Sequence, residues 1–386
     1  MIVFGDVEEG AIQQLATCLE HPRALAGVLM PDGHLGYSMP IGGVIAYDNC
    51  VSPSGVGFDI ACGNKAVRLD LKSHQVLPHI EEIMDTIVRE IAFGVGRNNP
   101  DDVEDQPVFQ DSGWEMFDQG LRQLAINQFG TVGGGNHYVD VFSDEDEQIW
   151  VGVHFGSRGF GHKVASGYLN LAAGKPFDAR YQDSINSPGV VLDLDTPLGL
   201  SYWQAMHMAG FYAYAARDYV CEKVARILGG AIVEEVHNHH NFAWEEYHDE
   251  LGKVVVVRKG ATPAHLNQKC FVGSTMAEES VILLGCGDPK TLRSAVHGAG
   301  RVMARHKAKG NRKKGKPGLI SQEDMGGLVN DANVCLRGAD VDEAPQCYKR
   351  LDEVLSYIPD SVDVIHRLRP IGVVMAGSDI FDPYKD

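Results

Sequence analysis

Long hydrophobic runs are missing from this chain of 386 residues. No stretch approaches the roughly 20 consecutive apolar residues that a membrane span needs. The first residues, Met1–Asp6, also lack a basic region followed by an apolar run, the pattern of a secretion signal. We therefore expect a protein without a membrane segment, located in the cytoplasm.

Cysteine pairing is also missing. Eight cysteines are scattered along the chain without the regular spacing of a disulfide framework. Together with the lack of a secretion signal, this pattern indicates reduced thiols in the cytoplasm.

An excess of positive charge is missing as well. The net charge of −18 argues against non-specific binding of nucleic acid over the whole surface. One short basic segment directly follows His297 and departs from this balance. A charged run is most often a solvated face, but its position beside His297 favours a binding role. Its members are Arg301, Arg305, Lys307, Lys309, Arg312, Lys313, Lys314 and Lys316.

The common nucleotide-binding loops are absent. Neither a Walker A pattern nor a strand-linked GxGxxG occurs, so a P-loop NTPase and a Rossmann cofactor domain are not supported. Glycine itself is abundant, with 44 residues, and its clusters lie beside His, Cys or Asp. Such loops can present several N–H groups to an anion, because glycine allows close backbone approach. The clusters are Gly33–Gly43, Gly55–Gly63, Gly130–Gly135, Gly156–Gly161 and Gly298–Gly300.

Helices and strands are expected without regular alternation, and we see no internal repeat. This mixture favours the α+β class over a doubly wound sheet. Helical periodicity predicts helices over residues 8–20, 78–91 and 202–228. Short β-branched runs predict strands over residues 43–47, 148–154, 253–258 and 280–284.

Several residues could bind a metal ion. Asp59 and Cys62 lie three residues apart in a glycine-flanked turn, so both can point at one ion. His137 and His154 lie at the edges of glycine loops, and residues 237–241 add three more histidines. A thiolate, imidazoles and one carboxylate suit Zn, Mn, Fe or Co, and a thiolate can bridge the two ions of a phosphoryl-transfer site. A lone buried cysteine is more often a small hydrophobe, so spacing alone leaves the metal site and a structural role both open.

Longer motifs carry a resemblance to a known family. The runs at 30–37, 40–43, 51–53 and 55–63 resemble the N-terminal signature of the RtcB family of RNA-splicing ligases. The resemblance spans nearly the whole chain and implies a single large domain, residues 1–386, with the compact RtcB-type fold around a central metal cleft. Further motifs follow in the order of the family: Gly133–His137, His154–Gly159, His240-Asn241, Arg258–Ala261, His297–Arg301, and Asp342–Pro345 with Tyr348-Lys349.

The resemblance implies two Mn²⁺ ions that share Cys62. One ion is expected on Asp59, Cys62 and His137, and the other on Cys62, His154 and His240. The His-Asn pair of the family selects His240 from its cluster. We expect His237 and His239 to lie behind the ligands or at the surface.

The resemblance also implies GTP as a cofactor. His297 matches the histidine that the family guanylylates, and a neutral imidazole is a competent nucleophile toward an activated α-phosphate. Arg158 resembles a phosphate-contacting residue, a task suited to the arginine fork. The nucleotide pocket carries over as Asn136, His137, Tyr138, Val139, Asp140, His240, Asn241, Gly273, Ser274, Thr275, Met276, Ser280, His297, Gly298, Ala299 and Gly300.

Two departures concern the nucleotide. Asp140 stands where the family has glutamate, and its reach is shorter by one methylene. The family ends in Lys-Gly, with the lysine contacting the nucleotide. Here residues 369–374 run into Met375-Ala376-Gly377, and Lys385 is the one lysine of the tail that could substitute. The metal chemistry therefore transfers more securely than the nucleotide preference.

The implied function is a GTP- and Mn-dependent RNA ligase. It would join 2′,3′-cyclic phosphate or 3′-phosphate ends to 5′-hydroxyl ends through a guanylylated His297 and an RNA 3′-pp-G intermediate. The basic segment would hold the RNA backbone. The alternatives are a non-sealing paralogue that binds damaged RNA ends and a metal-dependent cyclic phosphodiesterase. An archease-like activator is implied by resemblance only, and the sequence predicts no oligomeric state.

Overall fold

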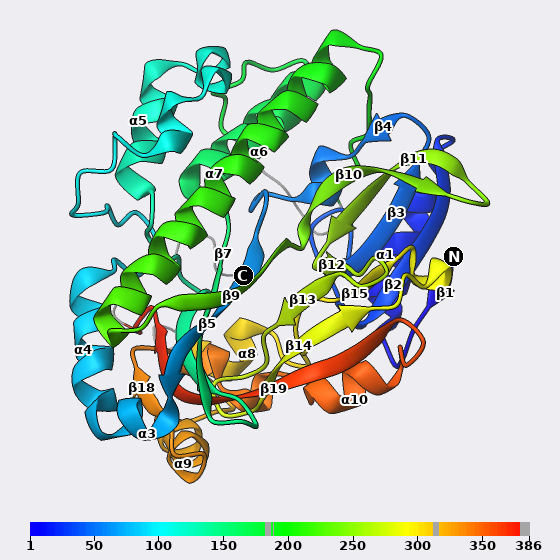
Figure 1. The fold of residues 1–386 in the computed structure, drawn as a ribbon. Coiled ribbons are helices and arrows are strands. Elements are labelled where there is room, and N and C mark those ends of the chain that lie inside the picture. The colour runs from blue at the N-terminus through cyan, green and yellow to red at the C-terminus, as the bar shows by residue number, and fades with distance from the viewer. Residues whose placement is uncertain (182–186, 188, 312–315, 379–386) are drawn as a thin grey trace.

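The computed structural model describes residues 1–181, 187, 189–311 and 316–378. Long helices gather on one side of the molecule and a five-stranded sheet lies on the other, with the largest sheet running between them (Figure 1).

The five-stranded sheet combines strands from residues 2–47 with strands from residues 241–259. Its order is β1-β2-β3-β11-β10, in which only β1 and β2 pair in parallel. The strands are β1 (Ile2–Val3), β2 (Ala24–His34), β3 (Ile41–Tyr47), β10 (Asn241–His248) and β11 (Gly252–Lys259).

The larger sheet has the order β13-β14-β19-β6-β7-β5-β9, with β18 added in parallel beside β19. It therefore joins strands that are up to 300 residues apart in the sequence. The strands are β5 (Gly63–Lys72), β6 (Tyr138–Ser143), β7 (Gln148–Phe155), β9 (Ile232–His239), β13 (Lys269–Val272), β14 (Ser280–Gly285), β18 (Cys335–Arg337) and β19 (Val362–Met375). Short pairs complete the strands: β4 (Cys50–Val51) with β8 (Leu192–Asp193), β12 (Ala261–Pro263) with β15 (Ser294–Val296), and β16 (Gly310–Asn311) with β17 (Lys316–Pro317).

The longest helix, α7 (Pro197–Leu228), packs against β7, β5 and the neighbouring α6. None of the helices in the described part of the chain combines the length and hydropathy of a membrane span. The other helices are α1 (Glu9–Leu19), α2 (Pro53–Val56), α3 (Ser73–Val76), α4 (Ile80–Glu90), α5 (Gln119–Gln128), α6 (Arg158–Ala172), α8 (Arg305–Lys309), α9 (Gln322–Asp331) and α10 (Leu351–Ser356).

Two of the three hydrophobic cores among the described residues hold these layers together. One lies between the large sheet and the helices, and includes Tyr212 of α7 and Val151 of β7. Another lies between the two sheets, where Val44 and Val256 of the five-stranded sheet share a cluster with Val281 of β14. Buried residues of both sheets therefore share one core.

The sequence predictions agree with these elements. The α+β class is confirmed, and every predicted helix and strand is present within a few residues. The largest difference is the start of α7, which was expected at Tyr202 and lies at Pro197. Thr196 accepts a hydrogen bond from the Gly199 amide and Pro197 occupies the first turn, so the cap extends the helix. The single-domain organisation stays a prediction.

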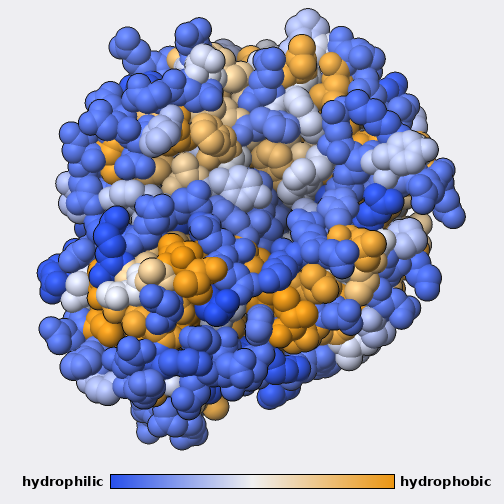
Figure 2. All heavy atoms as spheres, in the orientation of Figure 1, coloured by the Kyte–Doolittle hydropathy of each residue, from blue (hydrophilic) through white to orange (hydrophobic). Residues whose placement is uncertain are grey.

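The surface in view is mostly polar. Figure 2 shows that hydrophilic residues cover most of this face, and that hydrophobic residues form separate patches, the larger of which lie in its lower half. No continuous apolar band crosses the face in view.

Candidate metal and nucleotide site

A cleft of about 1080 Å³ opens where the two sheets meet. Residues from both sheets and from the glycine-rich loops line it. The five predicted metal ligands and His297 all lie in its wall: Asp59, Cys62, His137, His154, His240 and His297.

A tight turn delivers Cys62 to the cleft. The Cys62 amide donates to the Asp59 carbonyl at 3.0 Å, and Ala61 between them has a positive φ of 59°. Gly63 then begins β5 so close to the Asn238 backbone that a Cβ would collide with it. The turn therefore points the carboxylate and the thiol the same way.

The ligand atoms form two groups that share one sulfur. Asp59, Cys62 and His137 make up one group, and Cys62, His154 and His240 the other, with all ligand atoms of each group within 4.8 Å of one another. The Cys62 Sγ lies 3.6 Å from His137 Nε2 and 3.3 Å from His154 Nε2. We call these five residues the ligand cluster.

Hydrogen bonds orient two of the imidazoles. His154 Nδ1 donates to the Asn136 carbonyl at 3.1 Å, which leaves its Nε2 lone pair facing the cluster. The Asn241 Oδ1 accepts from the Gly260 amide at 2.7 Å and lies 3.3 Å from His240 Nδ1. His240 therefore donates through Nδ1 and also presents Nε2, 3.0 Å from that of His154.

The surroundings favour the protonation states that a metal requires. Burial lowers the pKa of His154 and of His240 well below its ordinary value, so both imidazoles are neutral. Burial opposes the ionisation of Asp59, but the hydrogen bond and charge of His137, 3.1 Å away, lower its pKa to about 2. Burial raises the pKa of the Cys62 thiol, and a bound cation would have the opposite effect.

His297 lies directly beside this cluster. Its ring centroid is 4.9 Å from that of His240. Its Nδ1 donates to Asp32 Oδ2 at 2.6 Å, and the same oxygen accepts from the His297 amide at 3.1 Å. Asp32 is completely buried, so the ring is fixed with its Nε2 lone pair available.

Most residues of the predicted nucleotide pocket also line the cleft, but two do not. Val139 points away from it, into the core beneath β6. Ser280 lies behind the wall, where its hydroxyl accepts from the Ser274 amide at 3.0 Å. The predicted residues that line the cleft are Asn136, His137, Tyr138, Asp140, His240, Asn241, Gly273, Ser274, Thr275, Met276, His297, Gly298, Ala299 and Gly300.

One end of the cleft holds buried polar atoms without a partner. Among the described residues, no hydrogen bond reaches the Tyr138, Ser274 and Thr275 hydroxyls or Asp140 Oδ1. Burial raises the pKa of the Asp140 carboxyl well above its usual range. Met375 lies opposite Tyr138 in the sheet and lines the same end. We call these five residues the β6 end.

The chain matches the family model described as tRNA-splicing ligase RtcB over residues 14–124 and 98–376. It is 31% identical to the RNA-splicing ligase RtcB of Escherichia coli K12 over 396 residues, covering 95% of this chain and 94% of that protein. It is 30% identical to the tRNA-splicing ligase RtcB of Thermococcus kodakarensis over 426 residues, covering 90% and 86%. This chain belongs to the RtcB family.

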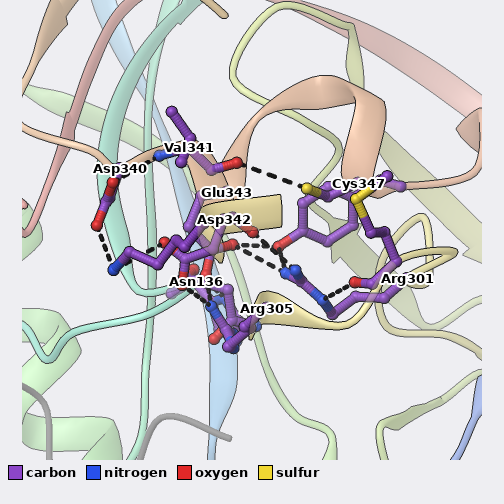
Figure 3. A network of polar contacts seen from close by, with 12 residues as sticks. Asn136, Arg301, Arg305, Asp340, Val341, Asp342, Glu343 and Cys347 are labelled. Atoms are coloured by element: carbon purple, nitrogen blue, oxygen red, sulfur yellow. Dashed lines mark hydrogen bonds and ion pairs between the residues drawn. The ribbon is translucent and has the colours of Figure 1, made fainter. Parts of the chain in front are cut away.

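The basic segment of this RtcB-family chain differs from a free cationic surface. Arg301 and Arg305 form ion pairs with the buried Glu343, and Arg305 also pairs with Asp342 at 3.2 Å. Lys309 pairs with Asp340 and, at 3.5 Å, with Asp342. Figure 3 shows Arg301 and Arg305 beside Asp342 and Glu343 of this acidic segment. The predicted contacts of this segment with RNA therefore cannot rest on these three cations alone.

Other predicted residues have different positions. Lys307 and Lys316 are exposed, whereas Arg312, Lys313 and Lys314 lie outside the described residues, as does Lys385 of the tail. Arg158, expected to contact phosphate, lies 3.5 Å from His137 Nδ1 and 3.4 Å from the Thr131 hydroxyl.

Asp32 contacts His297 in this site, and the sequence did not single it out for a role. It belongs to a motif of the RtcB resemblance, but 265 residues separate it from His297. The Pro-Asp-Gly context reads as a turn, and no local pattern connects it with a distant histidine.

Proposed function

We propose that this RtcB-family protein is an RNA ligase that joins 2′,3′-cyclic phosphate or 3′-phosphate ends to 5′-hydroxyl ends, using GTP and Mn²⁺. The observation that carries the proposal is the position of His297. Held by Asp32, it lies beside two ligand groups that share Cys62.

The donor set supports two ions of the manganese type. Each group offers three ligand atoms, and the imidazoles of His154 and His240 are neutral with Nε2 turned inward. A thiolate with imidazoles and one carboxylate suits Mn, Zn, Fe or Co. When bound, two such ions neutralise phosphate charge and align an in-line displacement.

His297 supplies the nucleophile. Because Asp32 accepts from Nδ1, the Nε2 lone pair is free to attack the α-phosphorus of GTP. An N–P bond forms, the bond to the β-phosphate oxygen breaks, and pyrophosphate leaves. An RNA 3′-phosphate oxygen then displaces His297 to give RNA 3′-pp-G, and attack by the 5′-hydroxyl expels GMP. A cyclic end is first opened by water to a 3′-phosphate.

The nucleotide base is assigned to the β6 end. Its unpartnered atoms, the Tyr138, Ser274 and Thr275 hydroxyls and Asp140 Oδ1, are suited to a polar ligand that hydrogen-bonds. No ion pair forms to Asp140 among the described residues, and Met375 adds no charge. Within the described residues, recognition of guanine at the β6 end would therefore depend on hydrogen bonds without a cation.

The RNA backbone is assigned to the mouth of the cleft. Lys307 is exposed there, and Arg301 and Arg305 line the wall while held by acidic residues. The cytoplasmic location, the archease-like activator and the single domain of residues 1–386 remain predictions.

Labelled GTP tests the proposal. The protein with Mn²⁺ and GTP carrying an α-phosphorus label should form an adduct that is labile to acid and stable to base, as a phosphoramidate is. His297→Ala should abolish the adduct and keep the bound metal. No adduct in the wild-type protein, with metal bound, would overturn the ligase in favour of an end-binding paralogue. Cyclic-phosphate opening that persists in His297→Ala without any sealing by the wild type would identify a phosphodiesterase.

A further inference from the structure

Arg217 lies in the middle of α7 with its side chain completely buried. Its guanidinium donates four hydrogen bonds to groups on three different strands or turns. Nη1 donates to the Ala61 carbonyl at 3.0 Å and to the Phe155 carbonyl at 2.6 Å. Nε donates to His237 Nε2 at 2.8 Å, and Nη2 to His239 Nδ1 at 2.9 Å.

Three of these four acceptors are chain neighbours of metal ligands. Ala61 precedes Cys62, Phe155 follows His154, and His239 precedes His240. The guanidinium therefore reaches all three chain segments that carry the Cys62–His154–His240 group. Within the described part of the chain, none of its hydrogen bonds reaches Asp59 or His137, the other ligands of the cluster.

Two of the three histidines in residues 237–241, His237 and His239, contact Arg217. As expected from the sequence, His237 and His239 do not join the ligand cluster. Each accepts a hydrogen bond from Arg217, so each is neutral and carries its proton on the other nitrogen. The proton of His237 then faces Asp218, whose Oδ1 is 3.3 Å from Nδ1.

A second buried arginine provides a contrast. Arg258, also completely buried, forms an ion pair with Glu246 at 2.5 Å and bonds to Ser294 and Leu292. Among the described residues, Arg217 forms no ion pair with a carboxylate. A buried cation without such a partner is costly, and the four hydrogen bonds of Arg217 offset that cost. All four hydrogen bonds of Arg217 lie behind the ligand cluster, which contains the acidic groups of Asp59 and Cys62.

We propose that Arg217 is a positioning residue that locks the backbone around Cys62, His154 and His240, and thereby determines the affinity of the metal ion on those three ligands. The planar fork suits this task, since a lysine ammonium presents its three donors from one atom and cannot span four acceptors. The inference rests on the two-metal site of the proposed function.

The test uses metal alone, without GTP or RNA. Full-length protein stripped of metal is titrated with Mn²⁺ by calorimetry, and with Co²⁺ while the thiolate charge-transfer absorption is followed. We expect two ions in the wild-type protein. Arg217→Lys should weaken the ion on Cys62, His154 and His240 by about 10- to 100-fold and affect the other ion less. Two ions bound as in the wild type, or equal weakening of both, would overturn the inference.

Two controls separate positioning from folding. Arg258→Lys alters an equally buried arginine and should keep both affinities even where it lowers the unfolding temperature. If Arg217→Lys does not fold, two variants of His239 provide the test. His239→Asn retains an acceptor near the Nδ1 position and should keep the ion on Cys62, His154 and His240. His239→Leu lacks an acceptor and should weaken binding of that ion. Equal binding by these two variants would refute the role of Arg217. Failure of the wild-type protein to bind metal would instead overturn the proposed function.

Discussion

Two adjoining parts of the cleft, the ligand cluster and the β6 end, differ in how their polar groups are satisfied. In the ligand cluster, His154 and His240 are each hydrogen-bonded on the nitrogen that faces away from the cluster, and Arg217 holds the backbone behind them. At the β6 end, four buried polar atoms have no partner within the described part of the chain, and Met375 adds an apolar wall. The ligand cluster is ordered by the protein itself, whereas the β6 end leaves polar atoms to which a ligand could hydrogen-bond.

The largest effect is expected from removing the sulfur that both ligand groups share. Cys62→Ala should abolish binding of both ions and with it adduct formation, because each group would keep only two ligands. Metal analysis by mass spectrometry after dialysis measures this result. Cys270→Ala, which changes a buried cysteine in the core between the two sheets, should keep both ions. A full metal complement in Cys62→Ala would show that the groups do not share a ligand.

A smaller effect is expected from adding charge to the β6 end. Tyr138 pairs with Met375 and Asp140 with Val373, so these side chains point to one face of the sheet. Met375→Lys would place an ammonium diagonally across from Asp140 and within reach of a purine O6. We expect selectivity for GTP over ATP in adduct formation to rise about tenfold, equivalent to ~1.4 kcal/mol.

Competition between the two labelled nucleotides measures that selectivity. Met375→Leu is the matched control and should behave as the wild type. Selectivity that is unchanged in Met375→Lys would place the base somewhere other than the β6 end.

The smallest effect concerns Asp140 and stability. Its pKa is raised in the folded protein by burial, so the folded state holds this proton more tightly than the unfolded chain does. Stability is therefore lost as pH rises from the ordinary aspartate pKa of 3.8 toward the raised value. Asp140→Asn should remove this component and unfold at a slightly higher temperature at neutral pH, as thermal melts across pH would show. Asp331→Asn changes an exposed aspartate and should leave the dependence of unfolding temperature on pH unchanged. A wild-type dependence on pH in Asp140→Asn would contradict the raised pKa of Asp140.

Much of the local structure could be predicted from the sequence. Helical periodicity located α1, α4 and α7, and β-branched runs located β3, β7, β11 and β14, because these patterns reflect burial on one face of a regular element. The turn from Asp59 to Cys62 could also be predicted, since glycines flank it and both candidate ligands lie within four residues. The family motifs selected His240 from its cluster where spacing could not.

Only the tertiary structure decided which partners these residues have. It joined Asp32 to His297, placed Arg217 behind the ligand cluster, and paired Arg301 and Arg305 with Glu343, where the sequence predicted a basic segment available to RNA. These contacts join residues distant in the chain, and no local pattern records them. They depend on how the two sheets and α7 pack, so the sequence by itself determined the ligand types, whereas the packing determined their orientation, charge and support.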